Sequence, residues 1–226
     1  LTMNKFLDKD DKGVLKVDKF DLSSLTQGNN SIISSETNSL INLIRSKIYH
    51  SCSINIGSPY TYNLNKHIVL DLAQKYGLLI PKYEIISNLN QIKGNNFTKD
   101  KFVTKALCEG IYKTIDKHHF YSYTESYKVD EFPEEKSIPI FPSLIMEQIE
   151  KRIEIRSFFL EENFYSMAIF SQSNEQTIVD FRKYDAEKPN KCEPFRLPLV
   201  VEKKLKKVFK RLNLNTGSVD LILDKK

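Results

Sequence analysis

The chain has 226 residues, of which 40% are hydrophobic and 28% are charged, and this balance predicts a folded protein of one or two domains. It has no apolar run of the about 18 residues that a membrane helix needs, and its charged start is unlike a signal peptide. A net charge of +5 suits an anionic partner but is weaker than the basic stripe typical of nucleic-acid binding. We therefore expect a cytoplasmic protein with no nucleic-acid or membrane partner.

The first half of the chain is predicted to contain both helices and strands. Residues 14–22 alternate apolar and polar side chains as a half-buried strand does. From Ser34 the apolar spacing becomes that of a helix. A second helix is predicted over 65–76, where the apolar side chains share one side and Gly77 ends the helix. Shorter elements follow as a strand over 83–87, a helix over 87–94 and a strand over 101–107.

The second half of the chain is richer in strands. The aromatic-rich segment 118–129 alternates as one strand, and a helix with many lysines is predicted over about 199–212, followed by a strand over 217–223. Between them, strand-like stretches follow one another so closely that an antiparallel sheet is favoured over a βαβ alternation, and the fold class is α+β. These stretches are 138–149, 154–160, 164–172 and 177–182.

Lys105 and Asp220 are single charged residues within otherwise apolar strands. Because burying an unpaired charge costs free energy, such a residue either lies at a sheet edge or faces a ligand. For Lys105, an edge position and a ligand anion are equally compatible with the sequence. Asp220 taken alone favours a structural role, whereas near phosphate groups it would be a natural ligand for Mg²⁺.

Two carboxylate–arginine pairs occupy alternate positions in two predicted strands, Glu154 with Arg156 and Asp180 with Arg182. Residues two apart in a strand point to the same face. The pairs suit ordinary cross-strand ion pairs, which contribute little at a surface, and they equally suit a polyphosphate site, because an arginine fork matches phosphoryl oxygens. The chain has no GxxxxGK[ST] or GxGxxG motif, so a nucleotide would be held without either glycine-rich phosphate cradle.

Five segments in a fixed order resemble the ATP-grasp peptide maturases, the grasp-with-spasm or graspetide group that includes microviridin-type ligases. The segment 33–59 also resembles the linker helix that precedes the ATP-grasp core in this group. The five segments are NKHIVLDLAQKYGLLIPKYEIIS (65–87), FVTKAL (102–107), FPSLIMEQIEKRIEIRSFFLEENFYSMAIFSQ (141–172), TIVDFRKY (177–184) and LNLNTGSVDLIL (212–223).

The resemblance implies an ATP-grasp fold, in which two α+β subdomains hold ATP between antiparallel sheets. Residues 1–60 would be the rest of an N-terminal region with its linker helix, 61–140 the N-terminal subdomain and 141–226 the C-terminal subdomain. The last strand with metal ligands would lie beyond residue 226, so the chain is expected to lack both ends of the whole protein.

The same resemblance implies ATP and Mg²⁺ as cofactors and assigns a role to nine residues. The assigned residues are Lys66 and Lys105 for the ATP phosphates, Glu147, Gln148 and Ile149 at the hinge for adenine, Lys151 for the ribose, Arg156 and Arg182 for the transferred phosphate or acyl phosphate, and Asp220 for Mg²⁺.

By resemblance, ATP would phosphorylate a side-chain carboxylate of a ribosomal precursor peptide, and a hydroxyl or amine of the same peptide would close an ester or amide ring. Two alternatives remain open, another ATP-grasp carboxylate–amine ligase of the glutamate-adding or glutathione-synthetase type, and a non-enzymatic binding module with a basic face. The expected partner is the precursor peptide, and a homodimer is a further expectation because related enzymes are often dimers. Without the remaining metal ligands, the chain as given is expected to be inactive.

Overall fold

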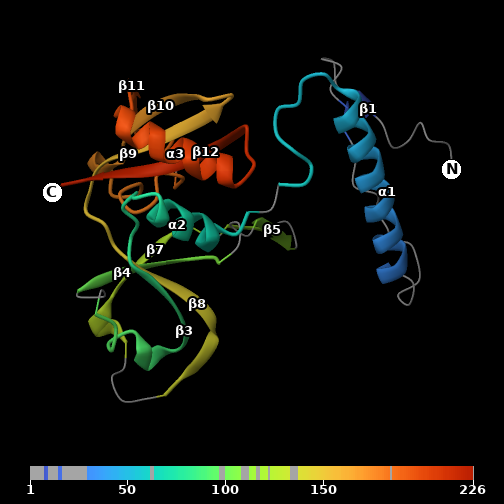
Figure 1. Cartoon of the computed structure of the whole chain (residues 1–226). Helices are drawn as coiled ribbons and strands as arrows, with labels where there is room; N and C mark the ends of the chain where they lie inside the picture. Colours follow the sequence, from blue (N-terminus) through green and yellow to red (C-terminus); the bar gives the residue numbers. More distant parts are fainter. Residues whose placement is uncertain are drawn as a thin grey trace. The chain divides into compact units, whose positions relative to one another are not determined.

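The computed structural model divides the chain into two compact units, Leu1–Asn55 and Ile56–Lys226. In the first unit, the long helix α1 (Asn30–Ser51) follows an antiparallel pair of short strands, β1 (Asp8–Lys9) and β2 (Leu15–Lys16) (Figure 1). The structure describes residues 8–9, 15–16, 30–61, 64–96, 100–107, 112–115, 118–121, 123–132, 137–183 and 185–225.

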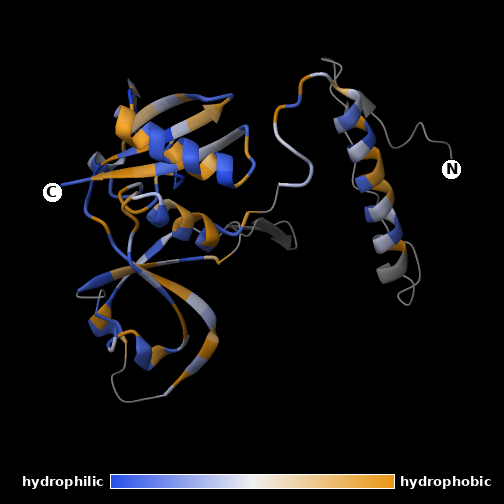
Figure 2. Cartoon of the chain, viewed as in Figure 1, coloured by the Kyte–Doolittle hydropathy of each residue, from blue (hydrophilic) through white to orange (hydrophobic). Residues whose placement is uncertain are grey.

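The helix predicted from Ser34 is confirmed as α1 and begins four residues earlier. Hydrophobic and hydrophilic residues alternate along it (Figure 2), and Leu40, Leu43 and Ile48 are exposed. The strand predicted over 14–22 lies mostly outside the described residues. None of the described helices combines the length and the apolar character that a membrane crossing needs.

The second unit contains, among its described residues, two four-stranded antiparallel sheets, which we call the first and the second sheet (Figure 1). The strand order is β3-β8-β4-β7 in the first sheet and β11-β10-β9-β12 in the second. A separate pair of strands, β5 (Tyr112–Ile115) and β6 (His118–Tyr121), is also antiparallel. The first sheet consists of β3 (Tyr83–Asn88), β4 (Lys101–Lys105), β7 (Glu125–Lys128) and β8 (Pro139–Glu147), and the second of β9 (Lys151–Leu160), β10 (Asn163–Phe170), β11 (Lys191–Phe195) and β12 (Thr216–Asp224).

The predicted series of closely spaced strands is confirmed for β8, β9 and β10, but it is shared between the two sheets. The chain leaves the first sheet at Glu147 and enters the second at Lys151, so residues 148–150 connect the two sheets. Sequence reasoning did not find β11. Pro194 lies in β11, which is an outer strand of its sheet, where a missing backbone donor is tolerated.

The strand predicted over 177–182 is wrong, because the chain forms turns there. The Asp180 carboxylate accepts a hydrogen bond from the backbone N–H of Arg182, and the N–H of Thr177 bonds to the carbonyl of Asn174. Such local bonds from Asp, Asn and Thr compete with a strand ladder. The single strand predicted over 118–129 is likewise divided into β6 and β7, and the N–H of Thr124 between them bonds to the Asp180 carboxylate.

One face of the second sheet forms a hydrophobic core with α3 (Leu199–Arg211). Ile153 and Ile155 of β9 and Ala168 of β10 pack there with Leu205 of α3, and all four are buried. Residues two apart in β9 point to the same face, so Ile153 and Ile155 turn to α3 while Arg156 turns to the opposite face.

The helix α2 (Lys66–Lys75) connects the two sheets of the second unit. Leu70 of α2 packs against the first sheet, and Leu78 just after the helix packs against the core of the second. The Asn65 side chain caps the start of α2 by accepting a hydrogen bond from the N–H of His67 at 2.9 Å. Lys204 of α3 donates to the carbonyl of Gly77 at 2.6 Å, which fixes the end of α2 against α3.

The first sheet is covered on both faces. Phe102 and Ile145 pack on one face, and Val103 and Leu144 on the other. Val179, from the turns that follow β10, also packs on the second of these faces, so a segment that leaves the second sheet completes the core of the first.

Replacement of Leu205 tests the core of the second sheet. Leu205→Ala should lower the free energy of unfolding by about 2–5 kcal/mol, because it leaves a cavity under a side chain that is 3% exposed. Urea denaturation followed by circular dichroism measures this change. Lys207→Ala, at an exposed position of the same helix, is the control and should change the unfolding free energy little; equal effects of the two variants would contradict this packing.

Candidate functional site

Lys105, at the end of β4, lies among charged groups from α2, from the turns that follow β10 and from β12. Burial lowers the pKa of Lys105, and the positive charges of Lys66 and Arg182 lower it further, while Asp180 and Asp220 act in the opposite direction. The interaction between two charges weakens as the distance between them grows. Residues that lie far apart in the sequence are therefore electrostatic neighbours in the fold, and the predicted residues Lys66, Lys105, Arg182 and Asp220 are brought together.

Arg156 and Asp220 are neighbours on adjacent strands of the second sheet. They are directly paired in the register of β9 and β12, and Arg156 Nε lies 3.9 Å from Asp220 Oδ1. The Arg156 guanidinium also lies over the Phe181 ring, with its carbon 5.9 Å from the ring centroid. Both charged side chains are half exposed, and such a pair contributes little to stability. Its charges therefore remain accessible to a ligand.

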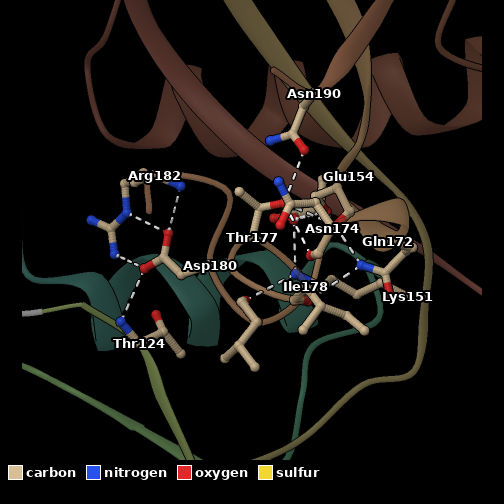
Figure 3. Close-up of polar contacts among 12 residues, drawn as sticks. Thr124, Lys151, Glu154, Gln172, Asn174, Thr177, Ile178, Asp180, Arg182 and Asn190 are labelled. Atoms are coloured by element: carbon tan, nitrogen blue, oxygen red, sulfur yellow. Dashed lines mark hydrogen bonds and ion pairs between the residues drawn. The ribbon is translucent and has the colours of Figure 1, made fainter. Parts of the chain in front are cut away.

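Asp180 is a buried carboxylate with four N–H donors, one of which is Arg182 Nη2. It accepts hydrogen bonds from Arg182 Nε at 2.8 Å, from the Arg182 backbone N–H at 3.0 Å and from the Thr124 N–H at 2.9 Å, and its side chain is 4% exposed (Figure 3). Burial alone would raise the pKa of Asp180, but these hydrogen bonds and the Arg182 charge outweigh it and lower the pKa to about 2. The hydrogen bond to Asp180 raises the pKa of Arg182. An ionised carboxylate thus holds one side of a guanidinium that is still 47% exposed.

Glu154 is paired with Lys151, although the sequence places it two residues from Arg156. Lys151 Nζ donates to Glu154 Oε1 at 2.7 Å and to the carbonyl of Val179 at 2.9 Å. Lys151 is 7% exposed, so its ammonium points into the protein and already has two partners. Its assignment to a ribose remains a prediction, and both partners of the ammonium belong to the protein itself.

The hinge residues Glu147, Gln148 and Ile149 lie at the crossing between the sheets and are half-buried. The Glu147 N–H donates to the carbonyl of Lys82 at 2.8 Å, and Gln148 Oε1 accepts from Ser126 Oγ at 2.6 Å. Two of the predicted hinge residues are therefore held by neighbours in the first sheet. Their contact with adenine remains a prediction.

Positive charge exceeds negative charge in this cluster. Lys66, Lys105, Arg156 and Arg182 contribute cations, and within the described part of the chain the facing carboxylates are Asp180 and Asp220. Burial lowers the pKa of Lys105, and the like charges of Lys66 and Arg182 lower it further, so their proximity is unfavourable. A polyanion placed there would relieve the repulsion, so the residues fit a nucleotide polyphosphate. The described residues contain no group of three His, Cys, Asp or Glu side chains arranged to hold a metal ion.

Comparison with known proteins places this arrangement in a known fold. No family model and no curated protein matches the chain. A RiPP-associated ATP-grasp ligase from Chryseobacterium gregarium, solved with ADP and a leader and core peptide, superposes with a TM-score of 0.73 and 21% identity over 90% of this chain and 60% of the ligase. The chain has the ATP-grasp fold.

Two further ATP-grasp structures are similar to this chain. The macrocyclase MdnC from Microcystis aeruginosa MRC, bound with precursor peptide MdnA, gives a TM-score of 0.63 and 23% identity over 93% of this chain and 66% of MdnC. The ATP-grasp ligase PsnB, with a phosphomimetic variant of its minimal precursor, Mg and ADP, gives 0.65 and 12% over 93% of this chain and 63% of PsnB. The chain thus spans less than two thirds of these proteins, and the predicted ATP-grasp fold with its antiparallel sheets is confirmed.

Acid denaturation tests the carboxylate that holds Arg182. Because the pKa of Asp180 is lowered from 3.8 to about 2 on folding, its contribution to stability is present above about pH 4 and is lost as the pH falls toward 2. Asp180→Asn should therefore lower the free energy of unfolding at neutral pH by about 1–2 kcal/mol, a figure reduced for the exposure of Arg182. It should also flatten the pH dependence of stability between about pH 4 and 2.

The control is Asp130→Asn, a carboxylate at an exposed position after β7, which should keep the wild-type pH dependence. Urea denaturation at a series of pH values measures both effects. The interpretation fails if Asp180→Asn and Asp130→Asn show the same slope in this range.

Proposed function

We propose that this protein is an ATP-dependent ligase that activates a side-chain carboxylate of a precursor peptide and joins it to a hydroxyl or amine of the same peptide. One observation carries the proposal: in an ATP-grasp fold, Lys66 of α2 and Arg182 of the turns after β10 act on the charge of Lys105 of β4, and Arg156 of β9 pairs with Asp220, which acts on it as well. The peptide is proposed as substrate because structurally similar ligases were solved with ADP and with precursor, leader or core peptides.

Lys66 and Lys105 would bind the ATP phosphates. Lys66 is the first residue of α2, so its ammonium adds to the positive end of a helix dipole. Asn65 already occupies the N–H groups of His67 and Ile68, so a phosphate would meet the lysine side chain and not these amides. Lys105 approaches from β4, and the two ammonium groups would hold the phosphates from two elements. The hinge backbone at 147–149 would contact adenine.

Asp220 would provide a ligand for Mg²⁺, since this ion prefers a few carboxylate oxygens together with phosphate oxygens. When bound, Mg²⁺ would neutralise phosphate charge. In the structure, Asp220 shares the exposed face of the second sheet with Arg156, and Asp220 also acts on the charges of Lys105 and Arg182. Its carboxylate therefore lies within the same cation cluster that would receive the phosphates.

Arg156 and Arg182 would hold the reacting groups. In the first step, an oxygen of the peptide carboxylate attacks the terminal phosphorus of ATP, and the bond to ADP breaks. In the second, the peptide hydroxyl or amine attacks the acyl carbon and phosphate leaves, with the loss of one proton from the attacking group. Both steps gather negative charge on oxygen atoms, so fixed guanidinium groups lower their barriers without a nucleophilic side chain. Asp180 fixes Arg182 for this task and leaves part of its guanidinium accessible.

The remaining features of the proposal concern the whole protein. We propose that residues 61–140 and 141–226 are the two subdomains, and that the protein is a cytoplasmic homodimer without a nucleic-acid or membrane partner. Light scattering and size-exclusion chromatography of the purified protein test its oligomeric state. Mass spectrometry of a precursor peptide incubated with the protein and ATP tests the reaction, because each ring formed removes one water.

Nucleotide binding to Lys105 variants tests the site without requiring turnover. Lys105→Ala should weaken binding of the non-hydrolysable analogue AMPPNP by about tenfold or more, because it removes a charge-assisted hydrogen bond from a half-buried position. Isothermal titration calorimetry in the presence of Mg²⁺ measures the affinity. Lys101→Ala removes the same charge from an exposed position of the same strand and should leave the affinity near that of the wild type. An unchanged affinity in Lys105→Ala would refute the site.

The role of Asp220 is tested by the dependence of binding on Mg²⁺. Asp220→Asn should fold normally, since the side chain is 56% exposed, and it should lose most of the gain in AMPPNP affinity that Mg²⁺ gives to the wild type. Titrations with Mg²⁺ measure the affinity for the metal-bound nucleotide, and titrations with EDTA measure the affinity for the metal-free nucleotide. The second affinity should not fall in Asp220→Asn, because the variant only removes a carboxylate from a cation cluster.

Asp224→Asn, in the same strand, is the matched control and should keep the Mg²⁺ effect. An Asp220→Asn variant whose affinity gains as much from Mg²⁺ as that of the wild type would show that Asp220 is no metal ligand.

A further inference from the structure

Residues 171–183, which we call the strap, leave the second sheet after β10 and make contacts with both sheets. At the first sheet, the Thr124 N–H donates to Asp180 at 2.9 Å, and Lys183 Nζ lies 2.7 Å from Glu125 Oε1. Val179 adds an apolar contact on the face that includes Leu144. The strap carries Arg182, so the place of this arginine in the cation cluster depends on how the strap is held.

A buried ion pair at the start of β9 holds the strap at two points (Figure 3). Glu154 Oε1 accepts a hydrogen bond from Ser171 Oγ at 2.7 Å, which fixes the first residue of the strap. Lys151 Nζ, 2.7 Å from the same carboxylate oxygen, donates to the carbonyl of Val179 at 2.9 Å. Val179 is the residue before Asp180, so the pair holds the backbone next to the carboxylate that binds Arg182.

A bulge in β9 places Lys151 and Glu154 on one side of the strand. Residues three apart in a regular strand point to opposite faces. Here the register with β12 shifts, because Ile153 pairs with Leu223 while Lys151 pairs with Asp224, so β9 has one extra residue. A bulge of this kind redirects a side chain. The irregularity thus turns the Lys151 ammonium toward Glu154 and the strap.

The strap is internally fixed, so its anchors position it as one piece. Thr177 is fully buried, and its hydroxyl lies 3.0 Å from the carbonyl oxygen of Ser171 and 2.9 Å from Asn190 Oδ1. Gln172 Nε2 donates to the carbonyl of Ile178 at 3.3 Å (Figure 3). A displacement at Ser171 or Val179 would therefore be passed to Asp180 and Arg182.

Stability alone does not account for a buried ion pair in this place. Removal of two charges from water is costly, and an apolar pair of similar size is often at least as stabilising. The charges instead fix the position of the strap, because the ammonium and the carboxylate each bind a defined atom of it. Neutral side chains of the same size should therefore preserve the fold better than they preserve the position of the strap.

We propose that Lys151 and Glu154 are positioning residues, which fix the strap so that Asp180 presents the Arg182 guanidinium to the phosphates, and that Lys151 makes no contact with the ribose. This inference rests on the proposed function for the identity of the bound anion. It changes the role of Lys151, whose ammonium binds the protein itself.

The test uses a neutral double variant, Lys151→Met with Glu154→Gln, since Lys151→Met alone leaves a buried charge without a partner and can fail to fold. Amide hydrogen exchange of the variant should be at least about tenfold faster in peptides that cover 174–183, whereas peptides of β10 should exchange as in the wild type. Arg152→Met, at the exposed neighbouring position of β9, is the control and should leave the strap unchanged. Unchanged exchange of 174–183 in the double variant would overturn the inference.

Nucleotide binding separates positioning from a purely structural effect. The double variant should weaken AMPPNP binding about tenfold in the wild-type background, but little in an Arg182→Ala background, because both changes remove the same contact. Equal losses in the two backgrounds would overturn the positioning role. The ratio of the affinities for ATP and 2′-deoxy-ATP should be unchanged, since a fall in this ratio would assign Lys151 to the ribose.

These readouts also separate the inference from the proposed function. A wild-type chain that does not bind AMPPNP would overturn the proposed function. Hydrogen exchange would still decide whether the ion pair anchors the strap, because that measurement needs no nucleotide.

Discussion

The Asp180 carboxylate is the interaction on which the rest of the site depends. It accepts a hydrogen bond from the backbone N–H of Thr124, just before β7 of the first sheet, and it holds the guanidinium of Arg182. A buried carboxylate with these donors stays ionised at all physiological pH values, as its pKa of about 2 indicates. The same group therefore joins the strap to the segment before β7 and holds an arginine beside Lys105. The Lys151–Glu154 pair fixes the position of Asp180, because Lys151 binds the carbonyl of the preceding residue, Val179.

The charge balance around Lys105 links this architecture to chemistry. Natural cores avoid like charges in close contact unless a partner compensates for them. Lys66 and Arg182 are nevertheless close enough to Lys105 to lower its pKa, and Arg156 has a half-exposed pairing with Asp220. In the proposed function, the phosphates of a nucleotide would restore the balance. Positioning and charge neutralisation are also what transfer of a phosphoryl group to a carboxylate requires.

The sequence singled out the charged residues that the fold brings together, but it did not predict the local structure around all of them. Lys105 and Asp220 stood out because each is a charge within an apolar segment, and both segments are strands, β4 and β12. Asp180 and Arg182 were grouped correctly but assigned to a strand, because Asx-type hydrogen bonds that form turns leave no periodic signal. The Lys151–Glu154 pair was not predicted. It depends on a bulge in β9, and the register that creates the bulge is a property of the assembled sheet.

A crystal structure of this chain with AMPPNP and Mg²⁺ would show directly where the phosphates bind. We predict the polyphosphate between the two sheets, with oxygens in hydrogen-bonding contact with Lys66, Lys105 and the exposed side of the Arg182 guanidinium, and with Lys151 still bound to Glu154 and Val179. Phosphates bound away from Lys105, or a Lys151 ammonium turned out to the ribose, would contradict it.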